Sequence, residues 1–151
     1  MIRFLEDENA TLALGADLAT QLQNRFNNCA LVFLNGQLGA GKTTMVRGLL
    51  QTLGHSGAVK SPTYTLLEPY ELAQTAVFHF DLYRVNDPQE LEFVGIDEII
   101  DGPGIKLFEW AEQALSWLPQ PQVIVNLDVA QQQDKAGNVL IGRTAEVIYV
   151  E

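Results

Sequence analysis

Cysteine and long apolar segments are scarce in this sequence. The single cysteine, Cys29, excludes an internal disulfide and a zinc site built from several cysteines. The longest purely apolar run covers residues 29–34, whereas a membrane-spanning helix needs about 20 residues. The first five residues lead directly into three acidic ones, which is unlike a secretory signal. We therefore expect a cytoplasmic protein with no membrane segment.

Positive charge is also scarce. Nine Lys and Arg residues stand against nineteen Asp and Glu residues, which gives a formal net charge of −10 and a pI near 4.5. Because Lys and Arg supply most of the affinity of proteins for nucleic-acid phosphates, this balance argues against direct binding of DNA or RNA. We expect the protein either to bind no polyanion or to meet one through a partner.

The chain nevertheless has enough apolar residues for a core. Its 151 residues are 47% hydrophobic, and this length suits one domain over residues 1–151. The patterning predicts strands at residues 2–5, 29–34, 63–70, 75–83 and 105–110, and a closing hairpin of residues 123–129 and 139–150. It predicts helices between Asp7 and Asn27, at 42–53, from Asp87 onward and at 111–118. Alternating strands and helices indicate an α/β fold.

A glycine-rich motif follows the buried strand at 29–34. Residues 36–43 read Gly-Gln-Leu-Gly-Ala-Gly-Lys-Thr, which fits the P-loop pattern. The glycines let successive backbone N–H groups face one phosphate, Lys42 reaches the β- and γ-phosphates, and the Thr43 hydroxyl ligates Mg²⁺. The motif therefore predicts a P-loop NTPase-like mixed sheet flanked by helices, with the hairpin as an addition.

Two acidic residues at strand ends are candidates to hold the hydrated metal ion. Asp81 ends one predicted strand and Glu109 ends another. Each is alternatively a solvated carboxylate, but ligands of α/β sheets bind at the carboxyl ends of strands. Ser61, Thr63 and Thr65 flank Pro62 and Tyr64, so this segment is either a phosphate-sensing switch loop or the start of a Thr-rich strand.

Other residues have less specific interpretations. Arg84 is either a phosphate contact or, as the sequence alone favours, the surface partner of Asp87. His79 is expected to be a packed strand histidine, and the tryptophans Trp110 and Trp117 to be core residues. No Asn-Lys-x-Asp element for guanine is present and no arginine cluster forms a kinase lid, so a compact ATPase is favoured over a GTPase or a small-molecule kinase.

At this point the sequence resembles the bacterial TsaE (YjeE) P-loop ATPases of tRNA threonylcarbamoyladenosine biosynthesis. The resemblance rests on an ordered set of segments between residues 11 and 110. These are Thr11 with Leu14-Gly15, the P-loop through Thr44, Ser61-Pro62-Thr63-Tyr64-Thr65, His79-Phe80-Asp81-Leu82-Tyr83-Arg84, Glu90-Leu91-Glu92 to Gly95, and Phe108-Glu109-Trp110.

The resemblance implies roles for individual residues. Thr11 would lie near the adenine of ATP or ADP, Thr43 and Glu109 would ligate Mg²⁺, and Asp81 would lie near the γ-phosphate and the attacking water. The implied nucleotide-binding set is Thr11, Gly36, Gly39, Ala40, Gly41, Lys42, Thr43, Thr44 and Arg143, with Lys42, Asp81 and Glu109 as the catalytic groups. Ser61, Thr63, Thr65, Arg84 and Trp110 would form the switch and its support.

The resemblance also implies a biological setting. In that family the ATPase acts with a TsaB–TsaD pair that transfers a threonylcarbamoyl group to the adenosine beside the anticodon of ANN-decoding tRNAs, and its ATP cycle resets the complex. The charge balance agrees, because an acidic chain suits docking on a more basic assembly and tRNA would be met only through the complex. The alternatives are a P-loop small-molecule kinase and a nucleotide-binding scaffold without useful hydrolysis.

Overall fold

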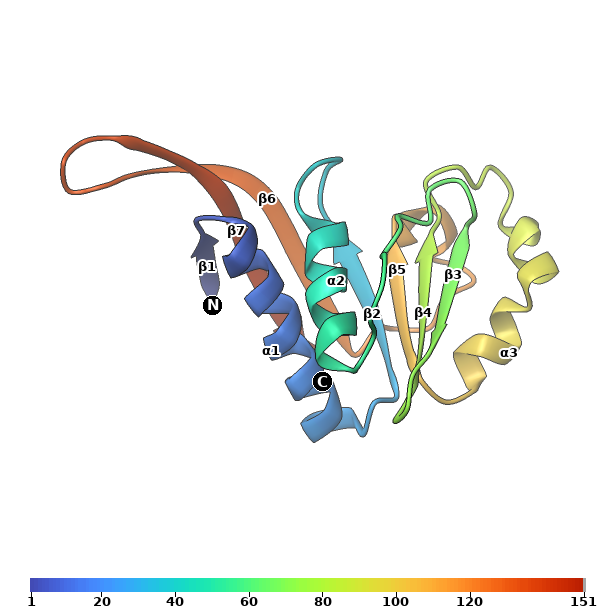
Figure 1. Cartoon of the computed structure of the whole chain (residues 1–151). Helices are drawn as coiled ribbons and strands as arrows, with labels where there is room; N and C mark the ends of the chain where they lie inside the picture. Colours follow the sequence, from blue (N-terminus) through green and yellow to red (C-terminus); the bar gives the residue numbers. More distant parts are fainter. Residues whose placement is uncertain (151) are drawn as a thin grey trace.

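A computed structural model describes residues 1–150, which form a seven-stranded sheet flanked by helices (Figure 1). The strands are β1 (Ile2–Leu5), β2 (Ala30–Asn35), β3 (Leu67–Glu71), β4 (Ala76–Asp81), β5 (Ile105–Glu109), β6 (Val123–Gln133) and β7 (Val139–Tyr149). The helices are α1 (Glu8–Phe26), α2 (Lys42–Thr52) and α3 (Ile96–Asp101), with 3₁₀ helices η1 (Pro88–Val94) and η2 (Ala111–Ala114). The predicted α/β class with a mixed sheet is confirmed.

The centre of the sheet is parallel. The strand order is β1-β7-β6-β2-β5-β4-β3; β2 pairs in parallel with β5 and β6, and β5 with β4, while the other pairings are antiparallel. β2 is buried over residues 30–34, which is why its apolar run is continuous rather than alternating. The carboxyl ends of β2, β4 and β5 therefore meet at one edge of the sheet, the usual place for a ligand.

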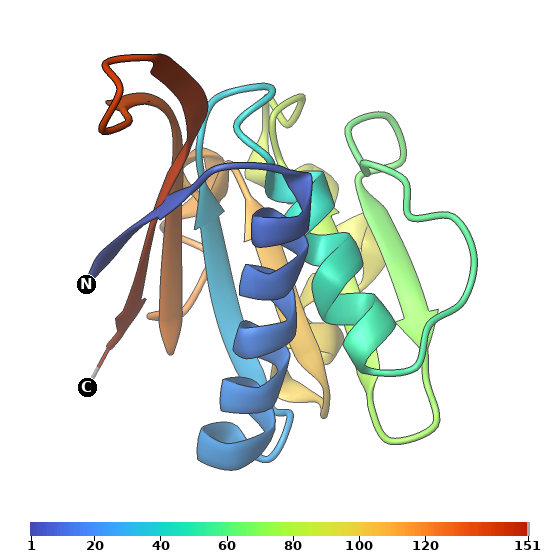
Figure 2. The ribbon, with the colours of Figure 1, turned by 60° about the vertical axis from the view of Figure 1, so that its left-hand side comes forward.

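Helices α1 and α2 lie side by side on one face of the sheet (Figure 2). Asp7 caps α1 as expected, since its carboxylate accepts a hydrogen bond from the Ala10 N–H at 2.8 Å. An added Cβ at Gly48 would lie 2.2 Å from the Leu12 carbonyl oxygen, and one at Gly15 would lie 2.0 Å from the Met45 carbonyl oxygen. The two helices approach this closely because neither position carries a side chain.

The opposite face of the sheet is covered by η1, α3 and η2. Phe80 and Phe108 stack there with ring centroids 4.4 Å apart, and Leu82, Leu91 and Ile96 are fully buried around them. Trp117 packs against the same cluster, as expected of a core tryptophan. The sheet thus has an apolar core on each face, and β5 in the middle of it is buried throughout.

Two predicted elements are wrong in extent. The strand predicted at 63–70 begins only at Leu67, because residues 62–65 form a turn in which the Leu66 N–H bonds the Pro62 carbonyl at 2.8 Å. The helix predicted at 111–118 is reduced to the short 3₁₀ helix Ala111–Ala114. In both segments local propensity gave way to packing against the neighbouring strands.

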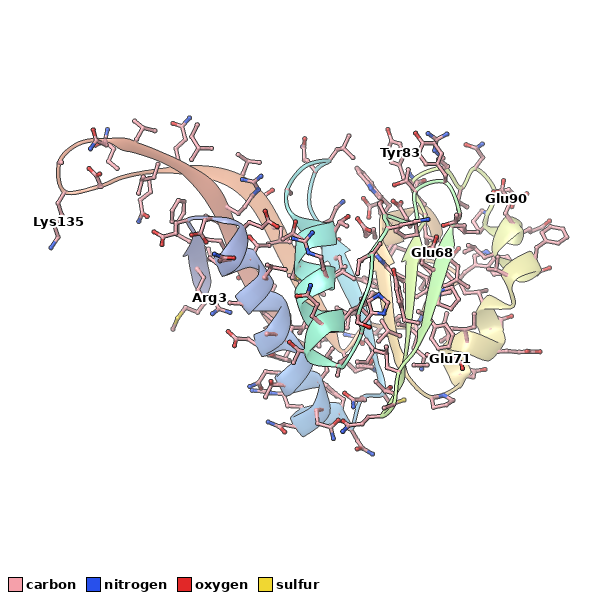
Figure 3. All side chains as sticks on the ribbon, in the orientation of Figure 1. Arg3, Glu68, Glu71, Tyr83, Glu90 and Lys135 are labelled. Carbon is pink, nitrogen blue, oxygen red and sulfur yellow. The ribbon has the colours of Figure 1, made fainter. Side chains whose placement is uncertain are left out.

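The closing hairpin is confirmed and is longer than predicted. Strands β6 and β7 extend past their neighbours as a curved arm, with Lys135 at its tip (Figures 1 and 3). The Asp134 carboxylate closes the turn by accepting bonds from the N–H groups of Ala136 and Asn138.

Across the described part of the chain, no helix has both the length and the apolar character needed to cross a bilayer.

Candidate nucleotide site

The glycine-rich motif forms the loop between β2 and α2, at the carboxyl edge of the sheet. Gly41 precedes the first residue of α2 with φ of 102°, a left-handed conformation that side chains disfavour. Lys42 is the first helical residue, so the free N–H groups at the start of α2 face the loop. This arrangement is that of an anion site at a helix N-terminus preceded by a curled glycine-rich backbone.

Lys42 is held inward by groups of the protein itself. Its side chain is 7% exposed, and its ammonium donates a hydrogen bond to the Gly36 carbonyl oxygen. Nζ also lies 3.3 Å from Glu109 Oε1 and 5.0 Å from the centre of the Trp110 ring. The Lys42 ammonium therefore lies next to a carbonyl acceptor, a carboxylate and an aromatic ring. These groups surround it beside the loop that would bind a phosphate.

Glu109 ends β5 and is 3% exposed, so the alternative of a solvated carboxylate is wrong for this residue. His79 lies beside it, with Nε2 2.7 Å from Glu109 Oε2. Burial raises the pKa of Glu109, but the hydrogen bond from His79 and the ammonium of Lys42 outweigh it and hold that pKa below its ordinary 4.5. The carboxyl is consequently ionised at neutral pH.

Asp81 ends β4 and is also buried, at 4% exposure, so the solvated alternative is wrong here too. Its Oδ2 accepts a hydrogen bond from the Thr63 hydroxyl at 2.8 Å, and its Oδ1 accepts one from the Tyr83 N–H at 2.9 Å. The Ser61 hydroxyl lies 2.8 Å from that of Thr63. The segment around Pro62 is thereby tied to Asp81 through hydroxyl groups, and the alternative of a strand start is wrong because residues 62–65 form a turn.

Most of the predicted site residues line one cavity of about 840 Å³ at this edge of the sheet. Those that do so are Gly39, Gly41, Lys42, Thr43, Thr44, Ser61, Thr63, Asp81, Arg84, Glu109, Trp110 and Arg143. Ala40 is buried beneath the loop, and Gly36 lines an adjoining cavity of about 480 Å³. The structure thus brings together residues from the P-loop, the Ser61–Thr63 segment, the ends of β4 and β5, and the hairpin.

Two predicted residues lie apart from this cavity. Thr11 is buried in α1 and lines a smaller neighbouring cavity of about 230 Å³ together with Gly41, Thr44 and Arg143. Thr65 does not line the cavity, and its hydroxyl donates to Glu68 Oε1 at 2.9 Å. Thr11 is therefore adjacent to the P-loop, whereas the Thr65 hydroxyl is bonded to β3.

Both arginines of the cavity have partners within the protein. Arg84 lies with its guanidinium 4.4 Å from the centre of the Tyr64 ring, and it forms no ion pair with Asp87 among the described residues. The surface pair that the sequence favoured is therefore wrong. Arg143, on β7, donates from Nη2 to the Gly39 carbonyl oxygen at 3.1 Å, while its buried Nε has no partner in residues 1–150.

The donor set fits a magnesium nucleotide. The Thr43 hydroxyl and the carboxylates of Asp81 and Glu109 line the same cavity, and hard oxygen ligands of this kind suit Mg²⁺. No group of three or more His, Cys, Asp or Glu side chains in residues 1–150 is arranged to hold a metal alone. A magnesium ion here would therefore depend on phosphate oxygens and water for its remaining ligands, as is usual for this ion.

Sequence reasoning missed the parts played by His79 and Tyr83, whereas Trp110 was already expected to support the site. His79 is fully buried as predicted, but it also contacts Glu109. Tyr83 packs on Trp110 with ring centroids 4.9 Å apart, at the end of β4 where Figure 3 labels it, and Trp110 itself has a positive φ of 58°. The available signal was the alternation along β4, which puts His79 on the same face as Asp81.

Comparison with known proteins identifies the family of this chain. A family model described as "Threonylcarbamoyl adenosine biosynthesis protein TsaE" matches residues 5–139. The tRNA threonylcarbamoyladenosine biosynthesis protein TsaE of Haemophilus influenzae is 45% identical over 95% of this chain and 90% of its own length. The protein of the same name from Rickettsia felis is 33% identical over 90% of this chain and 77% of its own.

A solved structure shares the fold. The crystal structure of YdiB from Bacillus subtilis superposes with a TM-score of 0.70, covering 99% of this chain and 86% of that one at 24% sequence identity. The family model covers most of the chain and includes every candidate site residue except Arg143. This chain therefore belongs to the TsaE family of threonylcarbamoyladenosine biosynthesis proteins.

Proposed function

We propose that this protein is a Mg²⁺-dependent ATPase that acts with a TsaB–TsaD pair in threonylcarbamoyl modification of the adenosine next to the anticodon of ANN-decoding tRNAs. The observation that carries the ATPase part is the convergence of Lys42, Asp81 and Glu109 on one cavity beside the P-loop. Family membership supports the pathway. The net charge of −10 supports contact with tRNA through partners rather than directly.

The residues of the cavity have distinct tasks in this proposal. The backbone N–H groups at the start of α2 bind the phosphates, and Lys42 turns from Glu109 and Gly36 toward them. Thr43 and Glu109 hold Mg²⁺, which when bound neutralises charge on the β- and γ-phosphates. Asp81 accepts a hydrogen bond from the attacking water and orients it toward the γ-phosphate. The Ser61–Thr63 segment, bonded to Asp81, senses whether that phosphate is present.

Hydrolysis by the isolated protein should be slow. Arg84 is stacked on Tyr64 and Arg143 is bonded to Gly39, so neither guanidinium is free to move onto the transferred phosphoryl group without losing a contact. An arginine that does reach this group is worth about 10³–10⁵ in rate. The partner complex would raise the rate by completing the site, and ATP binding and hydrolysis would reset that complex between turnovers.

The direct test is nucleotide binding and turnover by matched variants. Lys42→Ala should abolish ATP binding, measured by calorimetry, while the circular dichroism spectrum is retained. Asp81→Asn should bind ATP with near wild-type affinity but lose hydrolysis in the presence of TsaB–TsaD. Unchanged ATP affinity of Lys42→Ala would refute the P-loop assignment. A phosphorylated small molecule instead of inorganic phosphate as product would favour the kinase alternative.

A further inference from the structure

His79 has a polar environment that its position in the core does not explain. It lies in the middle of β4 with 0% of its side chain exposed. Its Nε2 is 2.7 Å from Glu109 Oε2, whereas its Nδ1 has no hydrogen-bond partner in residues 1–150. An apolar side chain would fill this position without an unpaired nitrogen, and burying an unpaired polar atom costs free energy. Within residues 1–150, the contact with Glu109 is the one polar interaction that offsets the cost of burying the His79 ring.

The contact depends on the register of two parallel strands. His79 pairs with Leu107, and Asp81 pairs with Glu109, so His79 lies two residues before Asp81 on the same face of the sheet. From there the ring reaches diagonally to the carboxylate. A carboxylate oxygen accepts hydrogen bonds, so at 2.7 Å the Nε2–H of His79 donates to Glu109 Oε2.

Glu109 is held at both oxygens by different elements. Oε2 contacts His79 on β4, and Oε1 lies 3.3 Å from the ammonium of Lys42 on α2. When Lys42 turns to the phosphates, as the proposed function requires, it gives up this contact. His79 then remains as the partner that fixes the direction of the carboxylate.

We propose that His79 is a positioning residue that holds Glu109 directed at the magnesium site while Lys42 is engaged by the nucleotide. This inference rests on the proposed function. Groups that hydrogen-bond a metal ligand orient it, and their loss typically lowers metal affinity about 10–100-fold. Loss of the His79 contact should therefore weaken the response of nucleotide binding to Mg²⁺ and leave Mg²⁺-free binding unchanged.

Two amide substitutions separate this role from simple packing. In His79→Gln the amide nitrogen lies near the position of Nε2 and can still donate to Glu109. In His79→Asn the same group lies near the position of Nδ1 and falls short of it. Both variants bury one neutral amide, so they carry a similar cost to the fold, and they differ mainly in reach.

The measurement is equilibrium binding of a fluorescent ADP analogue, first in EDTA and then across a Mg²⁺ titration. His79→Asn should need about 10–100-fold more Mg²⁺ than wild type for the half-maximal gain in affinity, with affinity in EDTA within about twofold. His79→Gln should stay close to wild type in both. If His79→Asn keeps the wild-type Mg²⁺ response, or if the two variants are equally impaired, the positioning role is wrong.

A second measurement uses the wild-type protein and does not depend on the variants folding. With ¹⁵N-labelled histidine, the Nε2–H signal of His79 should be protected from solvent exchange and should persist when Mg²⁺ and ADP bind. Its loss on binding would overturn the inference. If wild-type protein binds no nucleotide, the proposed function fails and the inference fails with it. If wild type binds nucleotide with a Mg²⁺ response and His79→Asn does likewise, only the inference fails.

Discussion

Removal of the charge on Glu109 should destabilise the nucleotide-free protein, and nucleotide should reverse much of the loss. The side chains of Lys42 and Glu109 are 7% and 4% exposed, and Lys42 Nζ lies 3.3 Å from Glu109 Oε1. In Glu109→Gln the ammonium of Lys42 stays buried without an anion, and breaking a buried pair in this way costs about 3–5 kcal/mol. Because Lys42 keeps the Gly36 carbonyl and the Trp110 ring, we expect the lower end, about 3 kcal/mol.

This loss is large enough to measure by thermal unfolding. For a chain of this size, 1 kcal/mol corresponds to about 2–4 °C, so the Tm of Glu109→Gln should fall by roughly 6–12 °C. ATP added in EDTA offers the ammonium new anionic partners, so it should raise the Tm of Glu109→Gln more than that of wild type. Glu112→Gln is the matched control, since it removes the same charge at an exposed position three residues away and should change stability by less than about 0.5 kcal/mol.

A double-mutant cycle tests the cause of the loss. In Lys42→Met/Glu109→Gln the unpaired ammonium is absent and both positions are uncharged, so most of the stability lost in Glu109→Gln should return. If the double variant is no more stable than Glu109→Gln, the cost does not come from a stranded charge. The argument that Lys42 and Glu109 hold each other in the nucleotide-free protein would then be refuted.

Two further predictions concern pH and the packing of α1 on α2. The pKa of Glu109 is lower in the folded protein than its ordinary 4.5, so the folded state binds fewer protons at this residue than the unfolded state does. The contribution of Glu109 to stability is therefore fully present above pH 4.5. It is lost as the pH falls through the lower pKa of the folded protein. The stability difference between wild type and Glu109→Gln in urea unfolding should therefore be full at neutral pH and shrink in acid; a difference that does not change with pH would contradict the assignment. Gly48→Ala should destabilise the protein by about 1–3 kcal/mol, although alanine has a better helix propensity than glycine. The reason is that the new Cβ meets the Leu12 carbonyl, so α1 and α2 must separate by about 1 Å. The exposed Asn24→Ala in α1 is its control, and equal urea midpoints for the two variants would show that the helix contact tolerates a side chain.

The parts of this protein that the sequence determined are those with local causes. The P-loop and the start of α1 at Asp7 follow from residues within a few positions of one another. The buried strand β2 also follows, because only a strand covered on both faces is apolar at every position from 30 to 34. The placement of Asp81 and Glu109 at strand ends then brings both carboxylates to one edge of the sheet.

Tertiary structure decided the contacts between residues that are distant along the chain. His79 and Glu109 are thirty positions apart and meet because β4 and β5 pair in one particular register, which a single-residue slip would abolish. Arg143 reaches Gly39 across 104 positions, and Arg84 lies on Tyr64 rather than beside Asp87. The pairing of distant strands depends on many weak contacts over both faces of the sheet, and no short stretch of sequence specifies all of them. For this reason the sequence alone identified most of the residues that line the candidate site, whereas the folded chain determined which of them hold one another.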